Sequence, residues 1–167
     1  MSCAACWGRA SRAEVLALQN SNSETEETPV TALDDIIRGM TFDFFGSGQH
    51  KIEIEDLLAT KDAVLLDVRD VLEQESLQLT LKHHLKVLWI PTCEIPDRLG
   101  EIPRDKTVGL FCTNGPRSAM VYLYLRSKGY EHVRIAPSSY DAITSLLVPG
   151  KLLKFLKQKG AAGEGAK

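Results

Sequence analysis

The sequence lacks long hydrophobic runs. Its longest unbroken apolar stretch extends only from Ala119 to Leu125, whereas a helix that crosses a membrane needs ~20 apolar residues. No apolar segment follows the first methionine, as a secretory signal would require. We therefore expect a cytoplasmic protein without a membrane span.

The chain also lacks an excess of charge of either sign. Its 20 basic and 22 acidic side chains leave a formal charge of −2, so no overall field attracts nucleic acid or an acidic lipid surface. We expect no nucleic-acid partner and no membrane partner. Any site for a polyanion has to be local.

Cysteine is scarce, with 4 residues in a chain of 167. Two of them, Cys3 and Cys6, lie close to the N-terminus, and the pattern is unlike the disulfide framework of a secreted protein. Their spacing is that of half a zinc site or of a redox pair. No second cysteine pair and no paired histidine motif supplies further ligands, so we expect no metal.

Composition divides the chain into a main domain with extensions at both ends. Residues 1–28 are predicted to be a flexible arm, because they include a polar, acidic stretch without apolar periodicity. Residues 29–49 are predicted to form an amphipathic helix and a connecting loop whose aromatic residues lie on the main domain. Residues 50–158 form the main domain with a C-terminal helix, and residues 159–167 a disordered tail.

Apolar strands alternate with helices in the main domain. Strands are predicted at residues 63–68, 87–90, 107–111 and 133–136. Helices are predicted at residues 53–59, 70–75, 95–99, 117–128 and 139–147. Strands made of continuous Val, Leu and Ile are typical of a parallel sheet with helices on both faces, which is an α/β fold.

The most informative segment joins the strand at residues 107–111 to the helix that follows it. Cys112 ends the strand, and Arg117 begins the helix. Ligands of parallel sheets bind beyond the carboxyl ends of the strands. Backbone N–H groups of such a loop, together with the helix dipole, lower the pKa of a thiol placed there. We therefore predict that Cys112 is a nucleophile and that Arg117 binds an anion.

The loop residues between Cys112 and Arg117 each have an expected role. Thr113 and Asn114 supply N–H groups, and their side chains lie at the mouth of the site. Gly115 permits a tight curl, whereas Pro116 has no N–H to contribute. Ser118, the next residue of the helix, either donates a hydrogen bond to a bound sulfur or caps the helix, and the sequence leaves both open.

Several motifs in order resemble a rhodanese domain, the single-domain type of sulfurtransferase. They are the segments 64–69 (VLLDVR), Ile90-Pro91, 112–118 (CTNGPRS) and 128–135 (KGYEHVRI). The resemblance implies a rhodanese-like open parallel five-stranded sheet with helices on both faces. It also implies that Cys112 takes a sulfane sulfur from thiosulfate or another donor, holds it as a persulfide and passes it to a thiophilic acceptor, without a cofactor.

The resemblance assigns structural roles to Asp67 and Arg69. Asp67 is expected to accept hydrogen bonds from loop amides, and Arg69 to pair with a nearby carboxylate such as Glu73. Either His83 or His84 corresponds to the histidine that the family carries before its third strand, and His84 is the better match. The sequence around these histidines departs from the family pattern, which leaves the sulfur acceptor open.

Two other functions are compatible with parts of the sequence. Related phosphatases use a roomier loop between Cys and Arg, usually with a His before the Cys, whereas Phe111 precedes Cys112 here. The smaller loop suits a single sulfur atom better than a phosphate. A rhodanese-like binding module with little turnover is the other alternative.

The expected partners contain sulfur. They are a small anion such as thiosulfate or a protein persulfide, together with a sulfur-carrier or redox partner protein. Cys93, in the loop after the second strand, either is a resolving thiol for Cys112 or has no role in the reaction.

Overall fold

The computed structural model describes residues 30–163, and only the backbone for residues 30–32 and 158–163. The predicted arm at residues 1–28, with Cys3 and Cys6, lies outside the described residues. Residues 164–167 of the predicted tail lie outside them as well. None of the helices in the described part of the chain is both long and apolar enough to cross a membrane.

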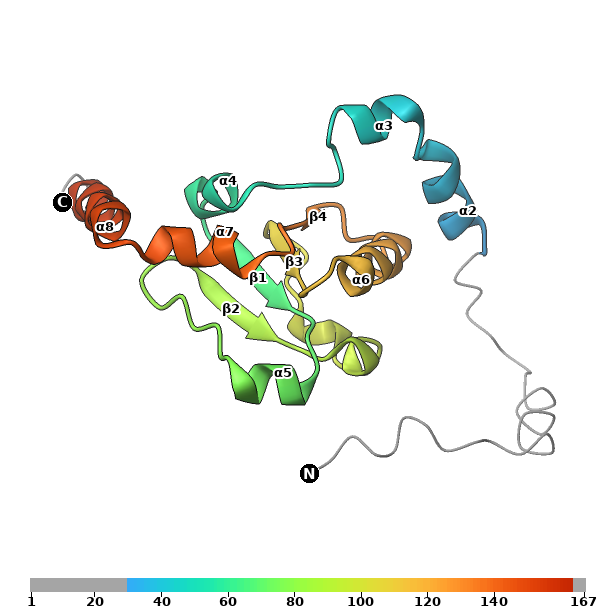
Figure 1. Cartoon of the computed structure of the whole chain (residues 1–167). Coiled ribbons are helices and arrows are strands. Elements are labelled where there is room, and N and C mark those ends of the chain that lie inside the picture. The colour runs from blue at the N-terminus through green and yellow to red at the C-terminus, as the bar shows by residue number, and fades with distance from the viewer. Residues whose placement is uncertain (1–29, 164–167) are drawn as a thin grey trace.

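The centre of the molecule is a parallel sheet (Figure 1). Its four strands, in the spatial order β2-β1-β3-β4, are β1 (Val64–Asp67), β2 (Lys86–Trp89), β3 (Val108–Phe111) and β4 (Val133–Ile135). Every residue of β1 and β3 is buried, which explains why these strands are apolar except at Asp67, the last residue of β1. Asp67 and Phe111 pair in register, so the segments that follow them emerge side by side.

The expected fifth strand is reduced to a single bridge. Lys51 makes an isolated parallel bridge with Ile135. The Ile135 N–H donates to His50 O at 2.8 Å, and the Ile52 N–H donates to Ile135 O at 3.1 Å. A turn precedes this segment and α4 (Ile54–Ala59) follows it, so no longer pairing can form. Residues 30–163 therefore contain four strands and one bridge instead of the five strands expected.

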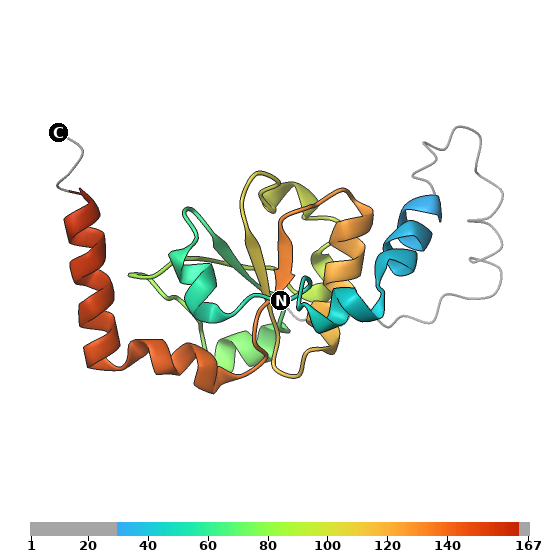
Figure 2. The same cartoon turned by 90° about the horizontal axis from the view of Figure 1, so that it is seen from above.

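Helices cover both faces of the sheet, as predicted (Figures 1 and 2). On one face lies α6 (Pro116–Ser127), and on the other lie α4 and α7 (Tyr140–Thr144). The cluster under α6 includes Leu66, Val108, Leu110, Val121 and Leu125. The cluster under α4 and α7 includes Ile54, Leu57, Leu65, Phe111 and Ile143. Neighbouring residues of one strand enter opposite clusters, because strand side chains alternate between the two faces.

The extensions contain three helices: α2 (Val30–Gly39), α3 (Phe42–Gly46) and α8 (Pro149–Gly163). Phe44 packs against the cluster under α6, but Phe42 is 94% exposed, so only part of this aromatic segment lies on the domain. The backbone of α8 is helical to Gly163. The helix thus continues past residue 158, the predicted end of the C-terminal helix, and includes Gly160 although glycine is a poor helix former.

One predicted helix is absent from the described chain. In place of a helix at residues 95–99, the chain forms short 3₁₀ turns at Thr92–Glu94 and Leu99–Glu101. Pro96 supplies no N–H for a helical hydrogen bond. The remaining predicted helices are present within a few residues of their expected bounds; α5 (Val71–Ser76) is the helix that follows β1.

Candidate active site

Cys112 lies at the carboxyl edge of the sheet, directly after β3, and none of its surface is exposed. The Gly115 N–H donates a hydrogen bond to Cys112 Sγ at 3.1 Å. Gly115 has φ of 89°, a conformation that strains residues with a side chain. A Cβ at this position would also lie 3.4 Å from Ser138 Oγ. Glycine therefore allows the loop to curl around the sulfur.

The loop lowers the pKa of the Cys112 thiol. Burial alone raises this pKa, because it removes water from the thiolate. The Ser118 hydroxyl and the backbone N–H groups of Ser118, Asn114 and Gly115 outweigh burial and bring the pKa below its ordinary value. The site thus favours the thiolate, which is the nucleophilic form of cysteine.

Ser118 is buried beside this loop. Its Oγ makes no hydrogen bond of standard geometry with the described residues, although its hydroxyl contributes to the lowered pKa of Cys112. We attribute the stabilisation chiefly to the backbone N–H groups, because the bond from Gly115 has normal geometry. Gly115, not Ser118, is the N-cap of α6. Ser118 Oγ therefore remains available as a donor to a second sulfur atom, and the capping alternative is wrong.

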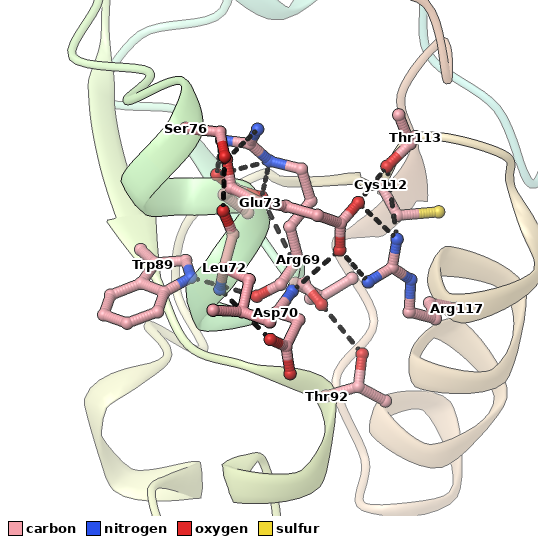
Figure 3. Close-up of polar contacts among 12 residues, drawn as sticks. Arg69, Asp70, Leu72, Glu73, Ser76, Trp89, Thr92, Cys112, Thr113 and Arg117 are labelled. Atoms are coloured by element: carbon pink, nitrogen blue, oxygen red, sulfur yellow. Dashed lines mark hydrogen bonds and ion pairs between the residues drawn. The ribbon is translucent and has the colours of Figure 1, made fainter. Parts of the chain in front are cut away.

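Arg117 is held by a carboxylate of α5 (Figure 3). Its Nη1 contacts Glu73 Oε2, and its Nη2 lies 2.8 Å from Glu73 Oε1. Arg117 Nη2 also donates to Thr113 Oγ1 at 3.2 Å, while the Thr113 hydroxyl donates to Glu73 Oε1. Glu73 therefore ties both sides of the loop, Thr113 and Arg117, to the neighbouring helix.

Glu73 is itself oriented by the start of α5. The Asp70 N–H donates to the Glu73 carboxylate at 3.0 Å, and the Asp70 side chain accepts from the Glu73 N–H, which together form a capping box. Asp70 Oδ1 also accepts from the Leu72 N–H at 3.1 Å. The ion pair with Arg117 is the main cause that lowers the pKa of Glu73 to about 2. At neutral pH this carboxylate is ionised and compensates the charge of Arg117. Glu73 was predicted as a partner of Arg69 and not as a residue of the site.

Asp67 and Arg69 form a buried ion pair beside the site. Arg69 Nη2 lies 2.7 Å from Asp67 Oδ2, and the two side chains are 0% and 1% exposed. Arg69 also donates to Tyr140 Oη at 2.7 Å and to Leu77 O at 2.9 Å. The expected pairing of Arg69 with the Glu73 carboxylate is wrong, because Arg69 reaches only the Glu73 backbone oxygen, at 3.4 Å.

The other predicted residues lie around the loop or away from it. Asn114 and Pro116 are exposed at its mouth. Cys93 is exposed in the turn after β2, and its role as a resolving thiol stays a prediction. His84 precedes β2 and stacks on Phe155 of α8 with ring centroids 4.7 Å apart, so it lies at the opposite edge of the sheet. Across residues 30–163, no group of three or more His, Cys, Asp or Glu residues could hold a metal.

Comparison with known proteins identifies one matching family. The rhodanese-like domain family matches residues 51–146, which include the loop, Glu73 and the Asp67–Arg69 pair. A tRNA sulfurtransferase of Aeromonas salmonicida is 33% identical over 85 residues, covering 51% of this chain and 17% of the relative. The chain thus corresponds to a small part of that longer protein.

A solved structure of low sequence identity shares the fold. A protein from Lactobacillus plantarum is 22% identical, with a TM-score of 0.51 over 70% of this chain and 96% of that one. A human single-domain sulfurtransferase is also 22% identical, with a TM-score of 0.45 over 57% of this chain and 96% of that one.

Proposed function

Because the chain belongs to the rhodanese-like domain family, we propose that it is a sulfurtransferase that carries a sulfane sulfur as a persulfide on Cys112. The observation that carries this proposal is the environment of Cys112 Sγ. The sulfur is buried at the end of β3 and surrounded by N–H groups that lower the pKa of the thiol. A small anionic sulfur species fits such a ring of donors.

In the first half of the reaction, the Cys112 thiolate attacks the outer sulfur of thiosulfate. A bond forms between Cys112 Sγ and that sulfur, and the bond between the two sulfurs of thiosulfate breaks. Sulfite leaves with the electron pair, and Cys112 carries an anionic persulfide. No proton and no external oxidant is required. A persulfide of a small thiol or of a protein can replace thiosulfate as donor, with a thiolate as the leaving group.

In the second half, a thiophilic acceptor attacks the outer sulfur of the persulfide. The bond between the two sulfurs breaks, and Cys112 regains its thiolate. The N–H groups of Asn114, Gly115 and Ser118 stabilise the negative charge that remains on sulfur throughout. The buried Ser118 hydroxyl supplies a further donor to the outer sulfur.

Arg117 has a positioning role in this scheme as well as an electrostatic one. Since Glu73 compensates its charge, the donor meets a guanidinium that is already paired. We therefore propose that anion binding relies chiefly on the loop N–H groups, and that the pair of Glu73 and Arg117 keeps these groups in place. We further propose that the reaction takes place in the cytoplasm.

Intact-protein mass spectrometry after incubation with thiosulfate tests the proposal. We expect a gain of one sulfur atom that is absent in Cys112→Ser, present in the matched control Cys93→Ser, and released as thiocyanate by cyanide. If neither thiosulfate nor a polysulfide donor adds sulfur to Cys112, the enzymatic proposal fails. The chain would then be a binding module that keeps the fold without turnover.

A further inference from the structure

A small polar pocket lies on the side of the molecule opposite to β2, between α6, β4 and the segment that follows α3. Its volume is about 240 Å³, and its lining residues are Phe44, Gln49, Lys51, Tyr122, Arg126 and Arg134. Phe44 and Tyr122 both pack into the cluster under α6, which joins the walls of the pocket. No lining residue belongs to the loop around Cys112.

Three cations from separate parts of the chain meet at this pocket. Arg126 of α6 and Arg134 of β4 donate to the same carbonyl oxygen, that of Glu131, at 2.9 Å and 3.1 Å. Two guanidinium groups are therefore adjacent. Lys51 is held beside β4 by its bridge to Ile135. Hydrogen bonds thus hold the two arginine side chains, and strand pairing holds the backbone of Lys51.

No carboxylate balances these charges. The lining of the pocket contains no acidic residue. Within the part of the chain whose side chains are described, Lys51, Arg126 and Arg134 make no ion pair, whereas Arg38, Arg69, Arg98 and Arg117 each pair with a carboxylate. Positive charges that line one small pocket repel each other, and an anion between them would relieve the repulsion. The two guanidinium groups donate only to backbone oxygens, those of Val133 and Glu131, so the pocket has the charge and the donors for an oxyanion but no anionic partner among the described side chains.

We propose that this pocket binds a phosphate group. Two guanidinium groups and an ammonium group match the several oxygens of a phosphate, to which arginine donates pairs of hydrogen bonds. The small volume and polar lining suit a phosphate better than a large apolar ligand, because pockets for such ligands have volumes of roughly 300 to 1,000 Å³. The net charge of the chain is −2, so the attraction is local. The inference does not depend on the proposed sulfur transfer.

Isothermal titration calorimetry of the full chain with inorganic phosphate, in phosphate-free buffer of low ionic strength, tests the proposal. We expect saturable binding that weakens at least about tenfold in the double variant Arg126→Gln/Arg134→Gln. The matched control Lys154→Gln/Lys157→Gln removes the same charge from the exposed surface of α8 and should bind phosphate as the natural chain does. If the double variant does not fold, the single exposed substitution Lys51→Gln replaces it, with the same direction expected.

A second titration with a short oligothymidylate distinguishes the two sources of a phosphate group. Tighter binding of the oligonucleotide that competes with phosphate assigns the pocket to a phosphodiester chain. Binding of inorganic phosphate alone assigns it to free phosphate or a small phosphate ester. The proposal is overturned if neither probe saturates, if the arginine variant binds as well as the natural chain, or if the α8 control loses as much affinity.

Discussion

Glu73 connects the reactive loop to α5 through Thr113 and Arg117. Its carboxylate accepts hydrogen bonds from Asp70, Thr113 and Arg117. The side chains of Arg117 and Glu73 are 33% and 31% exposed, so water screens their attraction, and we expect the pair to contribute about 1 kcal/mol to stability. Its effect on the position of the loop should be larger than its effect on stability.

Substitution Glu73→Gln tests this role. We expect the free energy of unfolding to fall by about 1 kcal/mol and persulfide formation to slow by roughly tenfold to a hundredfold, because small displacements of reacting groups are costly. Urea unfolding and the rate of sulfur addition measure the two effects. Glu75→Gln, an exposed carboxylate of the same helix, is the control and should change neither. An unchanged rate in Glu73→Gln would show that the loop keeps its position without the carboxylate.

The buried pair of Asp67 and Arg69 leads to a stability prediction. Arg69→Met leaves Asp67 buried without its cation, which should cost about 3 to 5 kcal/mol of unfolding free energy. The double variant Asp67→Asn/Arg69→Met removes both charges and should recover part of that loss. Chemical denaturation of the three proteins provides the comparison. A loss in the single variant as small as that of an exposed substitution would contradict the structural role of the pair.

Among the elements, the connection from β3 to α6 determines the chemistry of the site. The strand delivers Cys112 to the edge of the sheet, and the helix begins only four residues later, at Pro116. The intervening turn depends on the positive φ of Gly115. The acidity of the thiol therefore depends on a backbone conformation, in addition to nearby side chains.

Substitution Gly115→Ala should disturb this turn. The positive φ is unfavourable for alanine by about 1 kcal/mol, and relief of the strain moves the N–H that donates to Cys112 Sγ. We expect the pKa of Cys112 to rise toward its ordinary value. The pH profile of sulfur addition would then shift to higher pH, because the thiolate is the reactive form. Gly100→Ala is the control, since its Cβ would meet nothing within 4 Å. An unshifted profile in Gly115→Ala would contradict the role of this N–H.

The sequence predicted the central elements better than the peripheral ones. Strands β1 and β3 were predictable because they are buried on both sides and therefore apolar except at Asp67. The fifth strand that the family resemblance implied does not form within residues 30–163. The segment around Lys51 lies between a turn and α4 and pairs with β4 at one bridge only. Local sequence does not show where a neighbouring turn ends such pairing.

The reactive loop was predictable for a similar reason, since a cysteine between a strand and a helix is a local pattern. The partner of Arg117 was not, because Glu73 is 44 residues away in the chain and comes near Arg117 only because α5 follows β1 at the edge of the sheet where β3 also ends. The spacing of Asp70 and Glu73 is that of a capping box, and it is the one local signal that places the carboxylate at this edge of the sheet.

For the molecule as a whole, the same ion pair predicts how stability depends on pH. The pKa of Glu73 is about 2 in the folded chain, below the ordinary value of 4.5. A lowered carboxyl pKa contributes stability above the unfolded value, and this contribution is lost as the pH falls through the folded value. The difference in unfolding free energy between the natural chain and Glu73→Gln should therefore be constant above pH 4.5 and decrease toward pH 2.

Urea unfolding of both proteins across this range measures the difference. Other carboxylates titrate in both proteins, and their effects cancel in the comparison. A difference that stays constant down to pH 2 would contradict the assigned pKa.

The complete burial of Cys112 has a consequence for the lifetime of the protein in air. Peroxides and other oxidants damage thiols that they can contact, and Cys112 has no exposed surface, whereas Cys93 is exposed. Of these two cysteines, Cys93 meets dissolved oxidants first. Ageing should therefore first modify Cys93, because an oxidant reaches Cys112 only by entering the loop as the proposed sulfur donor does.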